Sequence, residues 1–365
     1  MLKYYAERAE NNGGLLVVEA TAPTSRLGLY ANTPILENDK QVEGWRHVVE
    51  SVHDNGSFIS IQLCGLGRTA DAALLRKHNL PLVAPSPIYI NENFTPHTTQ
   101  SREADEAAHN PLRALTVDEI HSFVEDYAAA ARRAIEGAKF DIVEIHGAHG
   151  YLVEQFLSSA ANHRTDEYGG SIENRARFGL EGVDALIAAV GAEHVTIRLS
   201  PYATFQATEG VNADISPIVS YGYVLSELER RAKAGKRLAY VSFVEPRVSG
   251  ADDVVDPPKV NTSWVNEIWK GVLLRTGGFL HDEGYPDLRK YVDADDRTLI
   301  GVSRYYTSSP DLANRLRNGY PLTHYDKPTF YVPKSNKGYL TFAKYGEKAL
   351  DDDSPEIKAE PRPLA

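Results

Sequence analysis

Short runs of apolar and β-branched residues recur along the chain, and each one ends in polar residues or glycine. Seven such runs predict strands, at residues 15–21, 58–63, 140–146, 194–201, 238–246, 271–278 and 297–304. Because the runs are almost continuously apolar, they are typical of strands that are covered on both faces. The pattern therefore predicts a parallel sheet.

Helical patterns separate these predicted strands. Thr116 and Glu119 form a capping box at the start of one helix, and Ser171 has the position of a helix N-cap. Alternating strands and helices in a chain of 365 residues predict an α/β protein with the (β/α)8 TIM barrel fold. A doubly wound open sheet is the alternative.

The predicted barrel lacks its first strand. The chain opens on the helical pattern YYAERAE without a strand before it, so seven strands are recognisable, and YLTF at 339–342 is a weak candidate for the eighth. We expect a single domain over residues 1–345, with an excursion over one barrel mouth at 85–111. The charged, proline-bearing tail at 346–365 is expected to be disordered.

Composition and charge make some classes of binding partner unfavourable. The chain is 42% hydrophobic and 24% charged, with 39 Lys and Arg against 50 Asp and Glu and a net charge of -11. These values indicate a globular protein and disfavour binding to nucleic acid. A single cysteine, Cys64, excludes an internal disulfide framework, and no apolar run is long enough to span a bilayer. We expect a cytoplasmic monomer or homodimer whose partner is a small molecule.

Polar residues gather where the predicted strands end, which is the active-site end of a barrel. The candidates are Gln62, His146, Arg198 and Glu245, with the segments 19–21, 275–278 and 303–304. Glycines and an arginine at the ends of the last two strands, at 277–278 and 304, are typical of a phosphate site. A phosphorylated heterocycle such as FMN fits this list better than a sugar or a metal.

Two histidines and a tyrosine lie together in DIVEIHGAHGYLVEQFL, residues 141–157. The N–H groups of neutral His146 and His149 can polarise a substrate oxygen, and Tyr151 can donate a proton. Alternatives stay open at this point. H-x-x-H binds zinc elsewhere but lacks a third ligand here, and one histidine can be purely structural. Spacing and composition alone indicate a barrel enzyme with a phosphate-bearing ligand.

The string NHRTDEYGGSIENRARF, at residues 162–178, strongly resembles the Old Yellow Enzyme family of FMN-dependent ene-reductases. The match extends to HGAHGYLVEQFL, SIQLCGLGR, VTIRLSPY, LLRTGGF and TLIGVSRYYTSSPDLANRLRNGYPL, covers about residues 4–331, and is closest to the fungal and yeast branch. The resemblance implies that NADPH reduces non-covalent FMN. The flavin N5 hydride then passes to the activated C=C bond of an enone, enal or nitroalkene.

The resemblance also implies roles for individual residues. His146 and His149 would bind the substrate oxygen, Tyr151 would protonate the α-carbon, and Tyr331 would border the substrate cavity. No metal is implied. The expected cofactor-binding residues are Ala20 against the flavin ring, Gln62 and Arg198 at its polar edge, and Gly278, Ser303 and Arg304 at the phosphate.

The chain departs from the family pattern at three places. Cys64 replaces the usual tryptophan, Ser303 replaces a glycine, and the first strand, which touches the flavin in the family, is absent from the pattern. These departures leave two alternatives to an ene-reductase. One is a truncated homologue that binds little or no flavin and uses the pocket of His146, His149 and Tyr151 for non-redox isomerisation or cyclisation. The other is a non-catalytic ligand-binding remnant.

Overall fold

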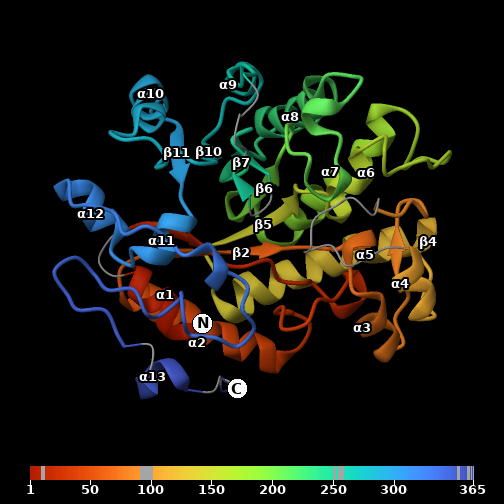
Figure 1. Ribbon diagram of the computed structural model, residues 1–365. Helices are drawn as coiled ribbons and strands as arrows, with labels where there is room; N and C mark the ends of the chain where they lie inside the picture. The colour runs from red at the N-terminus through yellow and green to blue at the C-terminus, as the bar shows by residue number, and fades with distance from the viewer. Residues whose placement is uncertain are drawn as a thin grey trace.

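The computed structural model describes residues 1–9, 13–90, 102–249, 252–253, 259–351 and 354–359, together with 362 and 364. Its main sheet has seven parallel strands, in the order in which they follow along the chain. Figure 1 shows these strands curving into a half-barrel with helices outside it. The strands are β1 (Leu15–Val17), β2 (Phe58–Leu63), β5 (Ile142–Gly147), β6 (Val195–Leu199), β7 (Tyr240–Val244), β10 (Leu273–Thr276) and β11 (Thr298–Gly301).

This topology confirms the predicted barrel-type α/β fold, and each of the seven predicted runs contributes one strand. The doubly wound alternative is wrong, because the strand order never reverses along the sheet. The α-helices are α1 (Leu2–Ala9), α2 (Asp39–Asp54), α3 (Ala72–Lys77), α4 (Arg102–Ala107), α5 (Val117–Arg132), α6 (Leu152–Leu157), α7 (Ile172–Val190), α8 (Pro217–Lys233), α9 (Trp264–Ile268), α10 (Pro286–Ala294), α11 (Arg304–Ser308), α12 (Leu312–Asn318) and α13 (Pro355–Lys358).

The predicted helix starts are confirmed in atomic detail. The Thr116 side chain accepts from the Glu119 N–H at 3.2 Å, and the Glu119 carboxylate accepts from the Thr116 N–H at 2.9 Å. Ser171 caps α7 by accepting from the Asn174 N–H at 3.3 Å. These caps satisfy N–H groups that have no partner within the first helical turn.

The two faces of the sheet differ in polarity because successive side chains of a strand point to opposite faces. On the outer face, apolar side chains such as Ile61, Val143, Ile197 and Phe243 are 0–1% exposed and pack in one core with α2, α5, α7 and α8. On the inner face, His146 lies opposite Arg198, and Arg198 lies opposite Ser242. The helices therefore cover the apolar face, and the concave face carries the polar groups.

The two edges of the half-barrel are joined by α1 rather than by a strand. Among the described residues, β1 pairs with β2 alone and β11 with β10 alone in the main sheet. Residues 339–342 form the end of a turn and a bend, so YLTF does not supply an eighth strand. Buried Arg8 of α1 donates to the carbonyl oxygens of Tyr306 at 2.9 Å, Thr307 at 2.6 Å and Tyr339 at 3.2 Å. One cation therefore links the N-terminal helix to the C-terminal part of the chain.

The predicted excursion begins and ends at a short parallel pair, β3 (Val83–Ala84) and β4 (Arg113–Ala114). Residues 91–101 of the excursion lie outside the described residues, so its path over the barrel mouth stays a prediction. A second small pair, β8 (Val248–Ser249) and β9 (Asp252–Asp253), is antiparallel. In the tail, α13 is described, and several neighbouring residues lie outside the description. The predicted disorder of residues 346–365 stays a prediction.

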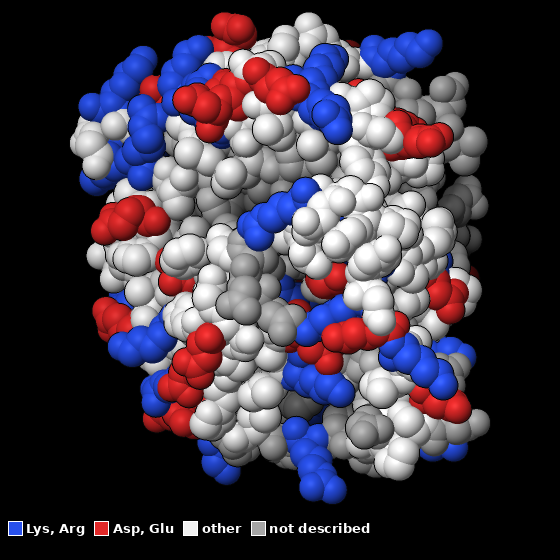
Figure 2. All heavy atoms as spheres, turned by 90° about the vertical axis from the view of Figure 1, so that its left-hand side faces the viewer, with Lys and Arg blue, Asp and Glu red and all other residues white. Residues whose placement is uncertain are grey.

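Charge is distributed in a mixed way over the face that Figure 2 presents, which is the left-hand side of Figure 1. Lys and Arg side chains are interspersed there with Asp and Glu side chains, apart from a group of Lys and Arg side chains at the upper left of the view. In the described ranges, no helix is both long and apolar enough to cross a membrane.

Candidate active site

The carboxyl ends of β2, β5 and β6 bring the predicted polar residues together. Gln62 and Glu144 lie opposite each other, and the Gln62 amide donates to the Glu144 carboxylate at 2.6 Å. One step further toward the strand ends, His146 lies beside Arg198. Gln62, His146 and Arg198 therefore lie on one concave surface, as the sequence analysis expected from their strand-end positions.

Glu144 is a site residue that the sequence analysis missed. It is 1% exposed, and burial raises the pKa of its carboxyl, whereas Arg198 lowers it. Its position two residues before His146 places it on the same face of β5, and this spacing is the signal that could have identified it. Within the described residues, the second oxygen of Glu144 and the Nε of Arg198 are buried without a hydrogen-bond partner.

The two histidines are buried and uncharged. Burial, then Arg198 and His149, hold the pKa of His146 well below its usual range. Burial followed by Arg198 lowers the pKa of His149 to about 3. The His146 Nδ1 accepts from the Ala148 N–H at 3.3 Å, so the neutral ring carries its proton on Nε2. Both imidazoles can therefore act as neutral N–H donors at physiological pH.

Tyr151 completes the cluster that the sequence predicted. The ring centres of His146 and His149 are 6.0 Å apart, and those of His146 and Tyr151 are 4.8 Å apart. Tyr151 occupies the N-cap of α6, and burial, followed by Cys64 and Tyr30, raises the pKa of its phenol. The phenol therefore stays protonated at neutral pH and is available as an acid.

Cys64 and Ala20 belong to the wall beside Tyr151. Ala20 and Tyr151 both pack against a small apolar cluster that contains Cys64, which is 1% exposed. Burial raises the pKa of the Cys64 thiol, so this residue serves as an apolar packing group rather than a nucleophile. The segment after β1 that carries Ala20 and the loop that carries Tyr151 therefore pack against the same apolar cluster.

The expected phosphate end lies at β10 and β11. Thr276 and Gly301 are opposite each other in the two strands, so the segments that follow them start side by side. Gly278 has φ +77°, a conformation that favours glycine. Ser303 is exposed at the N-cap of α11, and Arg304 is the first residue of that helix, with its guanidinium 6.0 Å from the centre of the Tyr325 ring.

Glu245 and Arg275, which the sequence analysis placed among the polar residues at the strand ends, do not join the cluster on the concave face. Arg275 is 1% exposed and forms an ion pair with Glu245, and it donates to Asn266 of α9 at 2.5 Å. Its side chain also lies over the ring of Tyr291, on α10. Arg275 neighbours inward-facing Leu274 and Thr276 in β10, so it points to the helix-covered face. This pair is part of the outer packing.

Tyr331 is 67% exposed and has φ +62°. Its phenol is close enough to Tyr151 to contribute to the raised pKa of that residue. Tyr331 therefore lies at the open side of the cluster. In the described part of the chain, no group of three or more His, Cys, Asp or Glu side chains is arranged to hold a metal ion.

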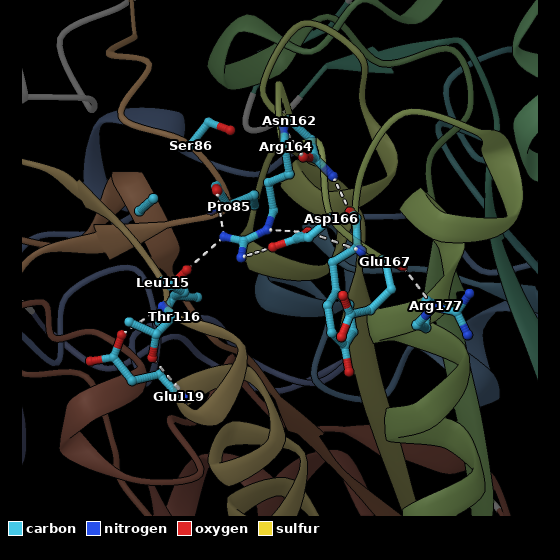
Figure 3. Close-up of polar contacts among 12 residues, drawn as sticks. Pro85, Ser86, Leu115, Thr116, Glu119, Asn162, Arg164, Asp166, Glu167 and Arg177 are labelled. Atoms are coloured by element: carbon cyan, nitrogen blue, oxygen red, sulfur yellow. Dashed lines mark hydrogen bonds and ion pairs between the residues drawn. The ribbon is translucent and has the colours of Figure 1, made fainter.

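The motif at 162–178 forms a clamp next to this site rather than part of the polar cluster (Figure 3). Arg164 donates to the carbonyl oxygens of Pro85 at 3.0 Å and Leu115 at 2.6 Å, and pairs with Asp166 at 2.6 Å. The His163 N–H donates to the Ser86 side chain at 2.9 Å. Arg164 thus ties both ends of the excursion to the segment that follows α6.

The polar atoms of the site fit a flat heterocycle with a phosphate tail. Four of the buried atoms that have no hydrogen-bond partner among the described residues belong to strand residues of the concave face or to the loop after β5: Arg198 Nε, His149 Nε2, Glu144 Oε2 and Ser60 Oγ. Buried donors and acceptors of this kind are normally satisfied by a ligand, by water or by protein. Gln62, Arg198 and the glycine turn at β10 supply the donor types that the ring edge and phosphate of FMN require.

Comparisons with known proteins agree with this geometry. The family model described as the NADH:flavin oxidoreductase / NADH oxidase family matches residues 1–323. The chain is 42% identical over 366 residues to a probable NADPH dehydrogenase of Candida albicans, covering 99% of this chain and 84% of that protein. It is also 42% identical over 350 residues to enoate reductase 1 of Kluyveromyces lactis, covering 95% and 85% respectively.

Solved structures share the fold over almost the whole chain. The crystal structure of Old Yellow Enzyme from Pichia sp. AKU4542 superposes with a TM-score of 0.93 at 55% identity, covering 100% of this chain and 89% of that chain. Morphinone reductase superposes with a TM-score of 0.78 at 33% identity, covering 96% and 90% respectively.

Proposed function

This chain belongs to the NADH:flavin oxidoreductase / NADH oxidase family, together with Old Yellow Enzyme, and we propose that it reduces activated C=C bonds of small enones, enals or nitroalkenes. The resemblance, the flavin cofactor and the oxidoreductase class that the sequence predicted are confirmed by the family match and the solved structures. NADPH is the proposed reductant, and FMN is bound non-covalently.

The observation that carries the proposal is the cluster of His146, His149 and Tyr151 beside Arg198. Two neutral imidazoles with low pKa values can donate N–H groups to one carbonyl or nitro oxygen without carrying charge themselves. Such donors polarise the conjugated C=C bond. The protonated phenol of Tyr151 lies next to His146 and is the acid that protonates the α-carbon.

The cofactor side of the proposal uses the same concave face. When bound, FMN supplies the hydride chemistry that no side chain of the site provides. Gln62 and Arg198 would hold the polar edge of its ring, and Ala20 would border the ring. Gly278, Ser303 and Arg304 would hold the phosphate, and Tyr331 would border the substrate cavity.

The comparisons do not favour the two alternatives raised by the sequence, which are flavin-free chemistry in the same pocket and a ligand-binding remnant. A small-molecule substrate agrees with the solved structures. We further propose a monomer or homodimer. A cytoplasmic location agrees with the reduced, buried state of Cys64.

The test is anaerobic single turnover of the FMN-loaded protein. NADPH should bleach the flavin absorption, and 2-cyclohexenone should restore it. We expect Tyr151→Phe to slow the enone-dependent restoration by about 10²- to 10⁴-fold while bleaching by NADPH stays near the wild-type rate. The physical reason is that this substitution removes the acid and leaves the ring in place.

Tyr223→Phe is the matched control, because this half-buried tyrosine of α8 packs against the core rather than in the cluster. It should behave as the wild type. Restoration at the wild-type rate in Tyr151→Phe would refute the assigned acid. A wild-type protein that binds no FMN, and therefore shows no absorption to bleach, would favour the flavin-free alternative.

A further inference from the structure

The loop that presents His149 and Tyr151 has an unusual backbone. His149 has φ +55° and Gly150 has φ +75°, so two successive residues adopt the left-handed region. For a histidine this conformation is strained, and it persists only where the surroundings hold it. The direction of the two side chains therefore depends on the groups that hold this turn.

Glu154 is the group that holds the N–H side of the turn. Its carboxylate accepts the Gly150 N–H at 2.6 Å and the Ser200 hydroxyl at 3.3 Å. The Ser200 oxygen in turn accepts the His149 N–H at 2.8 Å. The Gly150 N–H is thus hydrogen-bonded to Glu154 directly, and the His149 N–H is linked to Glu154 through the Ser200 hydroxyl.

Glu154 is itself fixed from the other side. It is 3% exposed, and the Tyr221 hydroxyl of α8 donates to it. A carboxylate has lone pairs for all three of these donors, whereas an amide at the same place offers one acceptor oxygen. Within the described residues Glu154 forms no ion pair, so hydrogen bonds alone hold its side chain. Burial raises the pKa of this carboxyl to about 7, and the hydrogen bonds from Tyr221, Gly150 and Ser200 oppose that rise.

Gln155, the next residue of α6, holds the carbonyl side of the same turn. Its amide donates to the Gly150 carbonyl at 2.7 Å and to the Leu66 carbonyl at 2.9 Å. Its oxygen accepts the Arg68 N–H at 3.1 Å. Gly150 is therefore fixed through both its N–H and its carbonyl by two successive side chains of α6. Glu154 in turn bonds to Ser200, directly after β6, and Gln155 bonds to the loop that follows β2.

We propose that Glu154 is a positioning residue for the reduction, because it fixes the left-handed turn that aims His149 and Tyr151 at the substrate. This inference rests on the proposed function, since it assumes the roles of those two residues. Glu154 does not touch the substrate itself. Its effect should therefore appear in the proton transfer to the substrate and not in reactions of the flavin that need neither side chain.

The experiment compares two oxidants of the NADPH-reduced, FMN-loaded protein. Glu154→Gln should slow reoxidation by 2-cyclohexenone by about 10- to 100-fold, because small misplacements of catalytic groups have effects of this size. Reoxidation by O2 should stay within about twofold of the wild-type rate, since it requires no oriented phenol. The solvent deuterium isotope effect of the enone reaction should rise, because proton transfer then limits the rate.

A second measurement does not depend on activity. Hydrogen exchange followed by mass spectrometry should show faster exchange of the His149 and Gly150 amides in Glu154→Gln, in a peptide over residues 146–157. Ser200→Ala removes the hydroxyl that links the His149 N–H to Glu154 and leaves the Gly150 N–H bonded to Glu154. It should speed exchange at the His149 amide and give a smaller loss of enone rate. It also keeps the proposal testable if Glu154→Gln does not fold.

Glu181→Gln is the matched control. Glu181 accepts the Tyr168 hydroxyl at 2.8 Å, as Glu154 accepts that of Tyr221, but in the described part of the chain it forms no hydrogen bond with the turn. Equal losses of the enone and O2 rates in Glu154→Gln, or wild-type values for both, would overturn the positioning role. A wild-type protein that O2 reoxidises and enone does not would refute the proposed function instead.

Discussion

At the residue scale, the two histidines show how burial fixes a protonation state. His149 is 8% exposed, and burial and the Arg198 charge both disfavour its imidazolium form. The folded protein therefore keeps His149 neutral at pH values where an unfolded chain protonates it. This difference couples the charge state of the site to the stability of the fold.

The coupling predicts a pH-dependent loss of stability. The folded pKa of His149 is about 3 and lies below the unfolded value of about 6.5. As the pH falls below about 6.5, the unfolded state binds a proton that the folded state does not bind, so the free energy of unfolding decreases. At about pH 5 the loss from this residue is about 2 kcal/mol relative to pH 7.5.

Denaturant unfolding at both pH values checks this prediction. His149→Asn removes the titrating group and accepts the left-handed backbone more easily. Between about pH 7.5 and pH 5, the wild type should lose about 2 kcal/mol more than the variant. An equal loss in both proteins would show that His149 is protonated in the folded state at pH 5.

At the element scale, the motif at 162–178 determines how the excursion is attached to the barrel. Asn162 donates to the carbonyl oxygens of Phe156 and Tyr168, both at 2.7 Å, and thereby shapes the loop that places Arg164. Arg164 then bridges Pro85 and Leu115 next to the capping box of α5 (Figure 3). The planar guanidinium suits this task because its donors point in several fixed directions.

Arg164→Ala should lower the free energy of unfolding by about 2 to 3 kcal/mol, because it leaves the Pro85 and Leu115 carbonyl oxygens without this donor and removes the ion pair with Asp166. Arg164→Lys should recover little of this lost unfolding free energy, because one ammonium group does not reproduce the planar set of donors of the guanidinium. Thermal or urea unfolding measures both variants.

Arg177→Ala is the control within the same motif. Arg177 donates to the Glu167 carbonyl at an exposed position, so its loss should cost about 1 kcal/mol or less. Equal losses of unfolding free energy in Arg164→Ala and Arg177→Ala would contradict the proposal that Arg164 holds the two ends of the excursion.

At the scale of the whole molecule, the proposed cofactor residues come from both halves of the sheet. Gln62 and Arg198 lie on β2 and β6, whereas Gly278 and Arg304 follow β10 and β11. A ligand that contacts all four connects the two halves of the half-barrel. Its binding should therefore stabilise the entire fold and not a single loop.

Thermal unfolding with and without flavin checks this prediction. FMN at about 100 times its dissociation constant should stabilise the fold by about 2.7 kcal/mol. Riboflavin lacks the phosphate, so at the same concentration it should give a smaller shift of the melting temperature. Arg304→Ala should reduce the difference between the two ligands, and Arg230→Ala, an exposed substitution on α8, should preserve it.

Equal shifts with FMN and riboflavin in the wild type would contradict the phosphate site at β10 and β11. The absence of any shift with either flavin would contradict the cofactor assignment as a whole.

The sequence by itself determined the local elements and the residue types at the strand ends. Apolar runs predicted the seven strands because the outward-facing side chains of most of them pack against the helices, although the concave face of several strands is polar. Caps such as Thr116 with Glu119 could be read directly, because their contacts are made within four residues. The motif at 162–178 indicated the family, but its spacing did not reveal the clamp that it forms.

Only the tertiary structure decided which polar residues meet. It assigned Arg275 and Glu245 to the outer packing, and it brought Glu154 to Ser200 and Tyr221, which lie 46 and 67 positions further along the chain. Strand-end position alone does not show which face a side chain takes, and burial depends on elements that are distant in sequence. For the same reason, the neutral state of His146 and His149 follows from the folded environment and not from the sequence.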